Sequence, residues 1–243
     1  ELHPFQKEIN RQAISLISDF DFTPTEETKS NLIKLGKKEV YNVRNTVIDV
    51  LFYIKNKVTL KKDLYFKKFS DINFSKKIVL ITGHKRENFD ATFENVLNSI
   101  KKLSNNYYHF EFIFPVYLNP MVKEVVVKLH ENQQNIKLLP PLLYYEMVFF
   151  MEQSHVIITD SGGIQEENRS LNTPVLVTRE STERKEGVVN GCLIMVGTDS
   201  KKMEESFSRL CEDQSYYDKV SNSQNQARDV TTSDQIMSIL NTK

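Results

Sequence analysis

The sequence contains few cysteines and no long hydrophobic run. Its two cysteines, Cys192 and Cys211, lie far apart and lack the spacing of metal ligands. This pattern predicts two structural thiols in a reducing compartment and no metal site. No stretch reaches the roughly eighteen apolar residues that a membrane helix requires, and no signal peptide begins the sequence. We therefore expect a cytoplasmic protein that has no membrane partner.

The sequence also has no excess of charge of either sign. Lys and Arg together number 32, Asp and Glu together number 32, and the formal net charge is +0 over 243 residues. A balanced charge offers no electrostatic basis for binding nucleic acid or an acidic membrane surface. With 40% hydrophobic and 26% charged residues, the composition is that of a globular protein with one large domain or two small ones.

Three common site patterns are missing as well. The sequence has no Ser-His-Asp set, no zinc-ligand spacing and no GxGxxG loop. The last of these leaves a nicotinamide site of the Rossmann type unsupported by the residues present.

A regular alternation of strand and helix patterns is present from residue 78 onward. Such an alternation predicts βαβ units, that is, an α/β fold with a parallel sheet covered on both faces. The expected strands are 78–81, 110–116, 136–139, 156–159, 175–177 and 193–196, and the expected helices are 89–103, 120–129, 144–153, 164–171 and 201–212.

The first part of the chain shows shorter elements of the same two kinds. Apolar spacing predicts helices over 6–18, 25–35 and 46–54, with short strands at 20–22 and 40–43. From residue 56 to 75 the pattern decays into lysines and aromatic residues, which we interpret as a linker with some local helix.

Polar loops follow three of the predicted strands. They cover 83–88, 160–163 and 179–184, and they carry backbone N–H, guanidinium, imidazole, hydroxyl and carboxylate groups. Because ligands of parallel sheets bind at the carboxyl ends of the strands, these loops predict a site for phosphate, ribose or sugar. His84 next to Arg86 is a candidate contact for a diphosphate or a leaving group. Loops that are simply solvated by charge remain the alternative.

The second loop has the most specific pattern. Ser161, Gly162 and Gly163 form a small-residue corner between a strand and a helix, where free N–H groups and the helix dipole suit a phosphate. Glu166 and Glu167 lie about one turn further on, and either could accept hydrogen bonds from a sugar hydroxyl. The alternative is that the serine serves only as a helix N-cap.

Taken together, the motifs resemble the non-hydrolysing UDP-N-acetylglucosamine 2-epimerases. Four segments in the same order carry the resemblance, and three earlier segments match as well, between His3 and Val220. The four are 82–89, 115–120, 160–167 and 182–184, and the earlier three are 8–11, 22–26 and 45–49.

The resemblance implies a GT-B-like architecture of two Rossmann-like parallel-sheet domains facing a cleft, the first of them truncated here. It implies 1–56 as a remnant of the amino-terminal domain, 57–75 as linker, 76–222 as the UDP-binding domain and 223–243 as a terminal helix or tail. The family uses no dissociable cofactor. Its members interconvert UDP-GlcNAc and UDP-ManNAc by eliminating UDP and re-adding it across a glycal intermediate.

The resemblance also assigns roles to single residues. Ser161, Gly162 and Gly163 would bind the diphosphate, and Glu167 would hold the ribose. The remaining assignments concern charge and catalysis: Arg86 and Arg184 would bind the departing UDP together with His84, and His84 and Arg11 are carried over as catalytic residues. These are the groups that the elimination of a doubly charged leaving group requires.

Several positions depart from the family pattern. Lys7 stands where a catalytic glutamate is expected, and the neighbouring Glu8 would point about 100° away on a helix. A large part of the family's first domain, with two of its acidic proton-transfer residues, is expected ahead of Glu1. The other departures are Arg44 for a glycine, Tyr117 for a histidine, Met147 for an aromatic residue, and the segments 185–187 and 223–229.

Three functions therefore stay open at this point. The first is a UDP-N-acetyl sugar 2-epimerase or a truncated relative of one, an isomerase whose acid and base residues are missing or replaced. The others are a non-catalytic UDP-sugar-binding subunit and a GT-B glycosyltransferase. We expect a UDP-N-acetyl sugar as ligand, and a homodimer or a complementing chain as partner, because helices 6–18 and 25–35 would expose apolar stripes.

Overall fold

The computed structural model describes residues 5–83, 91–116, 133–182, 185–223 and 231–242. The chain divides into two compact units, one formed by 1–52 with 229–243 and the other by 53–228. Among the described residues, no helix is both long and apolar enough to cross a membrane. The domain boundaries expected from the sequence remain a prediction.

The smaller unit contains a two-stranded parallel sheet with helices. Strands β1 (Asp21–Thr23) and β2 (Val40–Asn42) pair in parallel, and the helices are α1 (Phe5–Ile17), α2 (Glu26–Lys34), the first turns of α3 (Thr46–Thr59) and α12 (Thr232–Asn241). Thr25 caps α2, since its hydroxyl accepts a hydrogen bond from the Thr28 N–H at 3.1 Å. The chain leaves α2 through Gly36 at φ +85°, a conformation that favours glycine.

The larger unit is built on a six-stranded parallel sheet, as the alternating pattern predicts. The strand order is β5-β4-β3-β6-β7-β8. The chain therefore moves outward from β3 in one direction and outward from β6 in the other. The strands are β3 (Lys77–Thr82), β4 (Phe110–Pro115), β5 (Ile136–Leu139), β6 (Ser154–Thr159), β7 (Val175–Val177) and β8 (Leu193–Met195).

Both faces of this sheet are buried, which explains why its strands are almost continuously apolar. Val79 and Ile81 of β3 belong to the core cluster under one face. Ile78 and Leu80 alternate with them and are buried as well. A strand with one solvated face would instead show polar residues at every second position.

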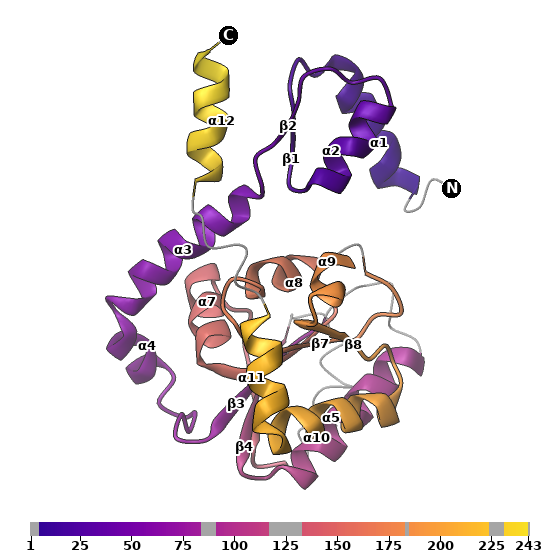
Figure 1. Ribbon diagram of the computed structural model, residues 1–243. Coiled ribbons are helices and arrows are strands. Elements are labelled where there is room, and N and C mark those ends of the chain that lie inside the picture. The colour runs from indigo at the N-terminus through magenta and orange to yellow at the C-terminus, as the bar shows by residue number, and fades with distance from the viewer. Residues whose placement is uncertain (1–4, 84–90, 117–132, 183–184, 224–230, 243) are drawn as a thin grey trace. The chain divides into compact units, whose positions relative to one another are not determined.

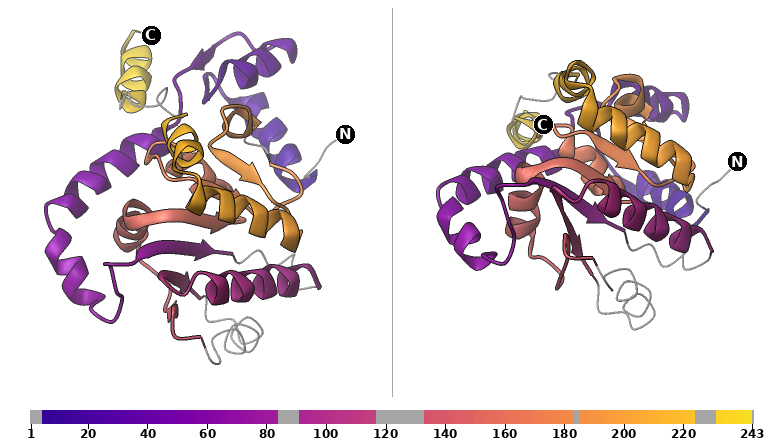
Figure 2. Two further views of the ribbon diagram at one scale, coloured as in Figure 1. Left: turned by 60° about the horizontal axis from the view of Figure 1, so that its bottom comes forward. Right: turned by 90° about the horizontal axis from the view of Figure 1, so that it is seen from below.

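Helices cover the two faces of the sheet. Helices α5 (Ala91–Asn106), α10 (Ser200–Glu212) and α11 (Gln214–Asn222) pack together on one face (Figure 2). On the other side of the sheet lie α7 (Tyr144–Gln153), α8 (Gly162–Asn168) and α9 (Lys185–Val189) (Figure 1). The expected helix over 120–129 lies outside the described residues.

The segment expected as a linker has more structure than its sequence pattern suggests. Helix α3 continues to Thr59 and is followed by α4 (Lys62–Lys68). The rings of Tyr65, Phe66 and Phe74 lie 5.2, 5.3 and 5.6 Å from the ring of Phe149 on α7. The aromatic residues of this stretch thus pack against α7 within the larger unit, while lysines between them stay exposed.

Candidate functional site

The candidate site lies where the order of the strands reverses. Strands β3 and β6 are neighbours in the sheet, and Thr82 pairs in register with Thr159 at their carboxyl ends. In open α/β sheets, ligands bind outside the carboxyl ends of the strands at such a reversal. The loops that begin at Gly83 and Asp160 therefore start at the position where this fold places a ligand.

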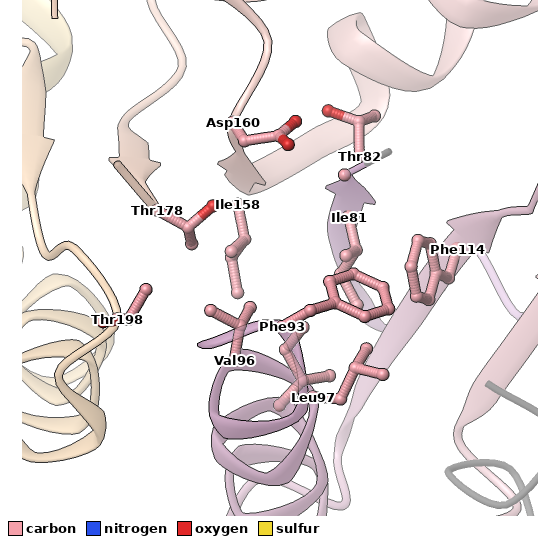
Figure 3. Close-up of a pocket in the computed structure, with 12 residues that line it drawn as sticks. Ile81, Thr82, Phe93, Val96, Leu97, Phe114, Ile158, Asp160, Thr178 and Thr198 are labelled. Atoms are coloured by element: carbon pink, nitrogen blue, oxygen red, sulfur yellow. The ribbon is translucent and has the colours of Figure 1, made fainter. Parts of the chain in front are cut away.

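Hydrogen bonds between buried and half-buried groups fix the two strand ends to each other. The Thr82 hydroxyl donates to Thr159 Oγ1 at 2.6 Å, and the Ser161 N–H donates to the same oxygen at 2.9 Å. The Asp160 N–H donates to the Thr82 carbonyl at 3.3 Å. Figure 3 shows Thr82 and Asp160 side by side at this edge. The corner after β6 is thus held against the end of β3.

The Ser161-Gly162-Gly163 corner opens helix α8. Ser161 occupies the N-cap position in an extended conformation, but its side chain makes no capping hydrogen bond in the described structure. The alternative of a serine that serves only as a cap is therefore not supported. The first N–H groups of a helix have no partner within the helix, and here they lie at the carboxyl edge of the sheet.

The two glycines of this corner leave free space beside the backbone. A Cβ atom added to Gly162 would have no described atom within 4 Å, and one added to Gly163 would meet only the Ser161 hydroxyl at 3.8 Å. Neither glycine has a positive φ. The packing of the described residues and the backbone conformation therefore do not require glycine here, whereas a ligand that approaches the backbone closely would.

Glu167 lies on α8 and is 9% exposed. Burial raises the pKa of its carboxyl to about 7, the Tyr144 hydroxyl opposes this by lowering the pKa, and the nearby Glu166 raises it further. Burial and the Glu167 carboxylate raise the pKa of Tyr144 to about 12. Glu167 can therefore exist in both protonation states near neutral pH.

A third contact ties the loop after β7 to α8. The Thr182 hydroxyl donates to Gln165 Oε1 at 2.6 Å, and the Gln165 side chain is fully buried. The third predicted loop therefore meets the second one at this edge. Gln165 lies within the segment 160–167, but its contact with Thr182 was not identified from the sequence, because that contact joins two separate segments. Tyr144 belongs to no motif and was not singled out.

A small cavity lies under the polar edge. Its volume is about 30 Å³, which suffices for one or two water molecules but not for a nucleotide. Figure 3 shows the polar residues Thr82 and Asp160 above the apolar side chains Ile81, Phe93, Val96, Leu97, Phe114 and Ile158, while Thr178 and Thr198 lie to one side. A nucleotide would therefore have to bind outside this cavity.

The structure brings four of the predicted site residues together. Ser161, Gly162, Gly163 and Glu167 all lie between the N-cap and the second turn of α8. The other predicted residues of the larger unit, His84, Arg86 and Arg184, lie outside the described residues. Arg11 lies exposed on α1 in the smaller unit. The described residues contain no group of three or more His, Cys, Asp and Glu that could hold a metal ion.

Comparison with known proteins gives one consistent result. A family model described as UDP-N-acetylglucosamine 2-epimerase matches residues 1–241, a longer stretch than the motifs alone cover. The UDP-N-acetylglucosamine 2-epimerase of Campylobacter jejuni is 40% identical, over 98% of this chain and 64% of its own. The enzyme of the same name from Neisseria meningitidis is 39% identical, over 91% of this chain and 61% of its own.

Solved structures agree with these sequence matches. UDP-GlcNAc 2-epimerase from Neisseria meningitidis, bound to UDP-GlcNAc, superposes with a TM-score of 0.92 at 37% identity, over 100% of this chain and 67% of that one. A complex of S. aureus MnaA with UDP superposes with a TM-score of 0.87 at 34% identity, over 99% of this chain and 65% of that one. The chain thus spans less than two thirds of the length of the curated relatives it matches.

Proposed function

This chain belongs to the UDP-N-acetylglucosamine 2-epimerase family and has the GT-B-like α/β fold of that family, and from this premise we propose that it binds a UDP-N-acetyl sugar. The diphosphate would contact the hydroxyl and N–H groups of Ser161, Gly162 and Gly163. The ribose hydroxyls would donate to the Glu167 carboxylate. The relatives solved with UDP-GlcNAc and with UDP support this assignment by similarity.

One observation carries the proposal: the unobstructed glycine corner and a buried carboxylate share the first two turns of one helix at the strand reversal. Gly162 and Glu167 are five residues apart on α8, which corresponds to about 7 Å along the helix axis. One nucleoside diphosphate can span this distance between its phosphates and its ribose. The described residues at this edge therefore fit both polar parts of UDP.

Basic residues would complete the leaving-group site. His84 and Arg86 follow Gly83 in sequence, and Arg184 follows Thr182. Gly83 and Thr182 both lie at the candidate edge. In a 2-epimerisation, the bond between the sugar C1 and the diphosphate oxygen breaks while C2 loses its proton, and both steps reverse after the glycal forms. Positive groups at the diphosphate lower the barrier because they stabilise the charge of the departing UDP.

The second candidate is a chain that binds UDP-sugar without catalysing epimerisation by itself. Lys7 favours it, because this residue of α1 stands where the family pattern has a catalytic glutamate. Loss of one acid or base group lowers a rate by about 10² to 10⁴. Under this candidate, a second copy or a complementing chain would supply the missing groups.

Calorimetric titration with UDP tests the proposal. We expect saturable binding that Arg184→Ala weakens by at least tenfold, because a charged hydrogen bond to phosphate contributes about 1.5–3 kcal/mol. Arg209→Ala is the matched control, since Arg209 is an exposed arginine of α10 that stacks on Tyr216. If UDP does not bind, or if both variants bind like the unaltered chain, the proposed site is wrong.

A second assay separates the two candidates. The chain is incubated with UDP-GlcNAc alone, and proton NMR follows the formation of UDP-ManNAc. Conversion without an added acceptor supports the epimerase and excludes a glycosyltransferase. Saturable UDP binding without conversion supports the binding subunit, and Lys7→Glu then tests whether restoring the acidic residue raises the rate.

A further inference from the structure

We propose that Gln165 is a positioning residue, which holds the loop after β7 against α8 so that this loop and the glycine corner can contact the diphosphate of one nucleotide. The inference rests on the proposed nucleotide site and adds a residue to it. Gln165 lies two residues after Gly163 on α8, and its partner Thr182 lies in the loop after β7. The contact therefore joins segments that leave two neighbouring strands, β6 and β7.

The contact is a short hydrogen bond between a half-buried residue and a fully buried one. The Thr182 hydroxyl donates to Gln165 Oε1 at 2.6 Å. The Gln165 side chain is 0% exposed, whereas Thr182 is half-buried. The backbone of Gln165 is fixed as well, because its N–H donates to the Ser161 carbonyl at 3.2 Å. The loop therefore meets an acceptor whose position is set by the first turn of α8.

Packing alone does not explain an amide at position 165. The Nε2 atom of Gln165 is buried and has no acceptor among the residues that the structure describes. A buried donor without an acceptor destabilises the folded state, so an apolar side chain of similar length would fill this place at lower cost. What the amide adds is the acceptor for Thr182, which an apolar side chain cannot supply.

A second contact ties the same loop to the strand on the other side of β7. Glu180 Oε1 accepts hydrogen bonds from the Thr198 N–H at 3.2 Å and from the Thr198 hydroxyl at 3.3 Å, in the turn after β8. A Cβ atom on Gly197, whose φ is +60°, would meet the same oxygen at 2.6 Å, so this close approach requires glycine. The loop is thus held at Glu180 by the turn after β8 and at Thr182 by α8.

Fixing this loop matters because of the residue that follows it in sequence. Arg184, which we propose for the diphosphate, lies outside the described residues and is two positions beyond Thr182. A charged group binds a phosphate more tightly when the chain that carries it is ordered before the ligand arrives, because the cost of ordering is then removed from binding. Since its own side chain is fully buried, Gln165 acts on the nucleotide only through the loop.

Gln165→Met tests the inference by separating affinity from stability. Methionine has a similar length and no amide, so the urea midpoint of unfolding should stay equal or rise, while UDP affinity in calorimetry falls about fivefold. Gln214→Met is the matched control, because Gln214 is exposed and its amide donates to Asp218 on the same helix, α11. It should leave UDP affinity unchanged.

Thr182 supplies a second pair of variants, which decides the question even if Gln165→Met does not fold. Thr182→Ser keeps the hydroxyl and should retain UDP affinity, whereas Thr182→Val should weaken binding about as much as Gln165→Met does. Adding Thr182→Val to Gln165→Met should cost less than about twofold more, because one contact can be lost only once. Two losses that multiply in full would show that the residues act independently, and the inference would be wrong.

The remaining outcomes distinguish the inference from the proposed function. In an Arg184→Ala background, Gln165→Met should lower UDP affinity no further, and a second full loss there would contradict action through the loop. If UDP binds, and folded Gln165→Met and Thr182→Val bind it as tightly as the unaltered chain, the inference is overturned and the proposed function stands. If the unaltered chain does not bind UDP, the proposed function itself has failed.

Discussion

Thr82 and Thr159, which are 77 residues apart in sequence, share a hydrogen bond of 2.6 Å between their hydroxyl groups at the carboxyl ends of β3 and β6. Thr159 Oγ1 also accepts the Ser161 N–H. One hydroxyl therefore connects the strand reversal to the start of the glycine corner. It links the order of the strands to the position of the candidate ligand site.

Thr159→Val tests this link. The substitution keeps the shape of the side chain but leaves the Ser161 N–H and the Thr82 hydroxyl without their acceptor. We expect the free energy of unfolding to fall by about 1–3 kcal/mol and UDP affinity to fall with it. Thr59→Val is the control, because the Thr59 hydroxyl makes only an exposed contact within α3. Urea unfolding measures the first quantity and calorimetry the second.

The protonation of Glu167 predicts how stability depends on pH. Folding raises its pKa from 4.5 to about 7. The folded state thus binds the proton more tightly than the unfolded state does. The contribution of this group to stability is complete below pH 4.5 and is lost as pH rises to 7. The loss amounts to at most about 3 kcal/mol.

Glu167→Gln should remove this contribution. The difference in unfolding free energy between the variant and the unaltered chain, measured in urea, should grow in favour of the variant between pH 5 and pH 8. A difference that stays constant with pH would contradict a raised pKa at Glu167. Glu205→Gln, at an exposed position of α10, controls for the general effect of removing one charge.

Arg44 carries backbone strain at a position where the family pattern has glycine. Its φ is 69°, a left-handed conformation that costs a non-glycine residue about 1–2 kcal/mol. Arg44→Gly relieves this cost but gives the unfolded chain more conformational freedom, which lowers the free energy of unfolding by about 0.4–1 kcal/mol. We expect a net gain of up to about 1.6 kcal/mol in the free energy of unfolding, measured by thermal or urea unfolding. Arg44→Ala keeps a Cβ, so a gain of the same size in that variant would refute the explanation.

The apolar stripes expected on the first two helices are exposed in the structure. On α1, Leu16 and Ile17 of the expected stripe are each 83% exposed, and on α2 Ile33 is 51% exposed. Exposed apolar side chains on one helix face favour association. We predict that the chain self-associates, and that Leu16→Gln combined with Ile17→Gln reduces the association in light scattering. Leu60→Gln, at a single exposed leucine, should leave it unchanged, and a monomeric unaltered chain would contradict the prediction.

Much of the larger unit follows from local sequence patterns. The bounds predicted for β5, α7 and β7 match the structure, because each is an apolar run or stripe with clear turn residues beside it. Helix α8 begins at Gly162, whereas the sequence predicts its start at Ile164. The prediction begins late because glycine adds nothing to the apolar periodicity on which it rests. Helices α9 and α11 were not predicted, because α9 is short and α11 is mostly polar.

The site was predictable only in part. The Ser161–Gly163 corner and Glu167 form a local motif, and the structure places them on one helix as expected. Their assigned roles in binding UDP remain predictions. The contacts of Thr82 with Thr159 and of Thr182 with Gln165 depend on how separate segments meet, and one sequence carries no signal for such pairs. The aromatic packing of residues 65–74 on Phe149 was missed for the same reason.

The most direct test of the central claim combines stability and binding in Gly162→Ala. The added methyl group meets no described atom within 4 Å, so we expect unfolding free energy to stay equal or to rise by up to about 1 kcal/mol. If the diphosphate approaches this backbone, the same methyl group should lower UDP affinity at least tenfold, while Asn106→Ala at the far end of α5 leaves it unchanged. A Gly162→Ala variant that binds UDP as tightly as the unaltered chain would contradict the account.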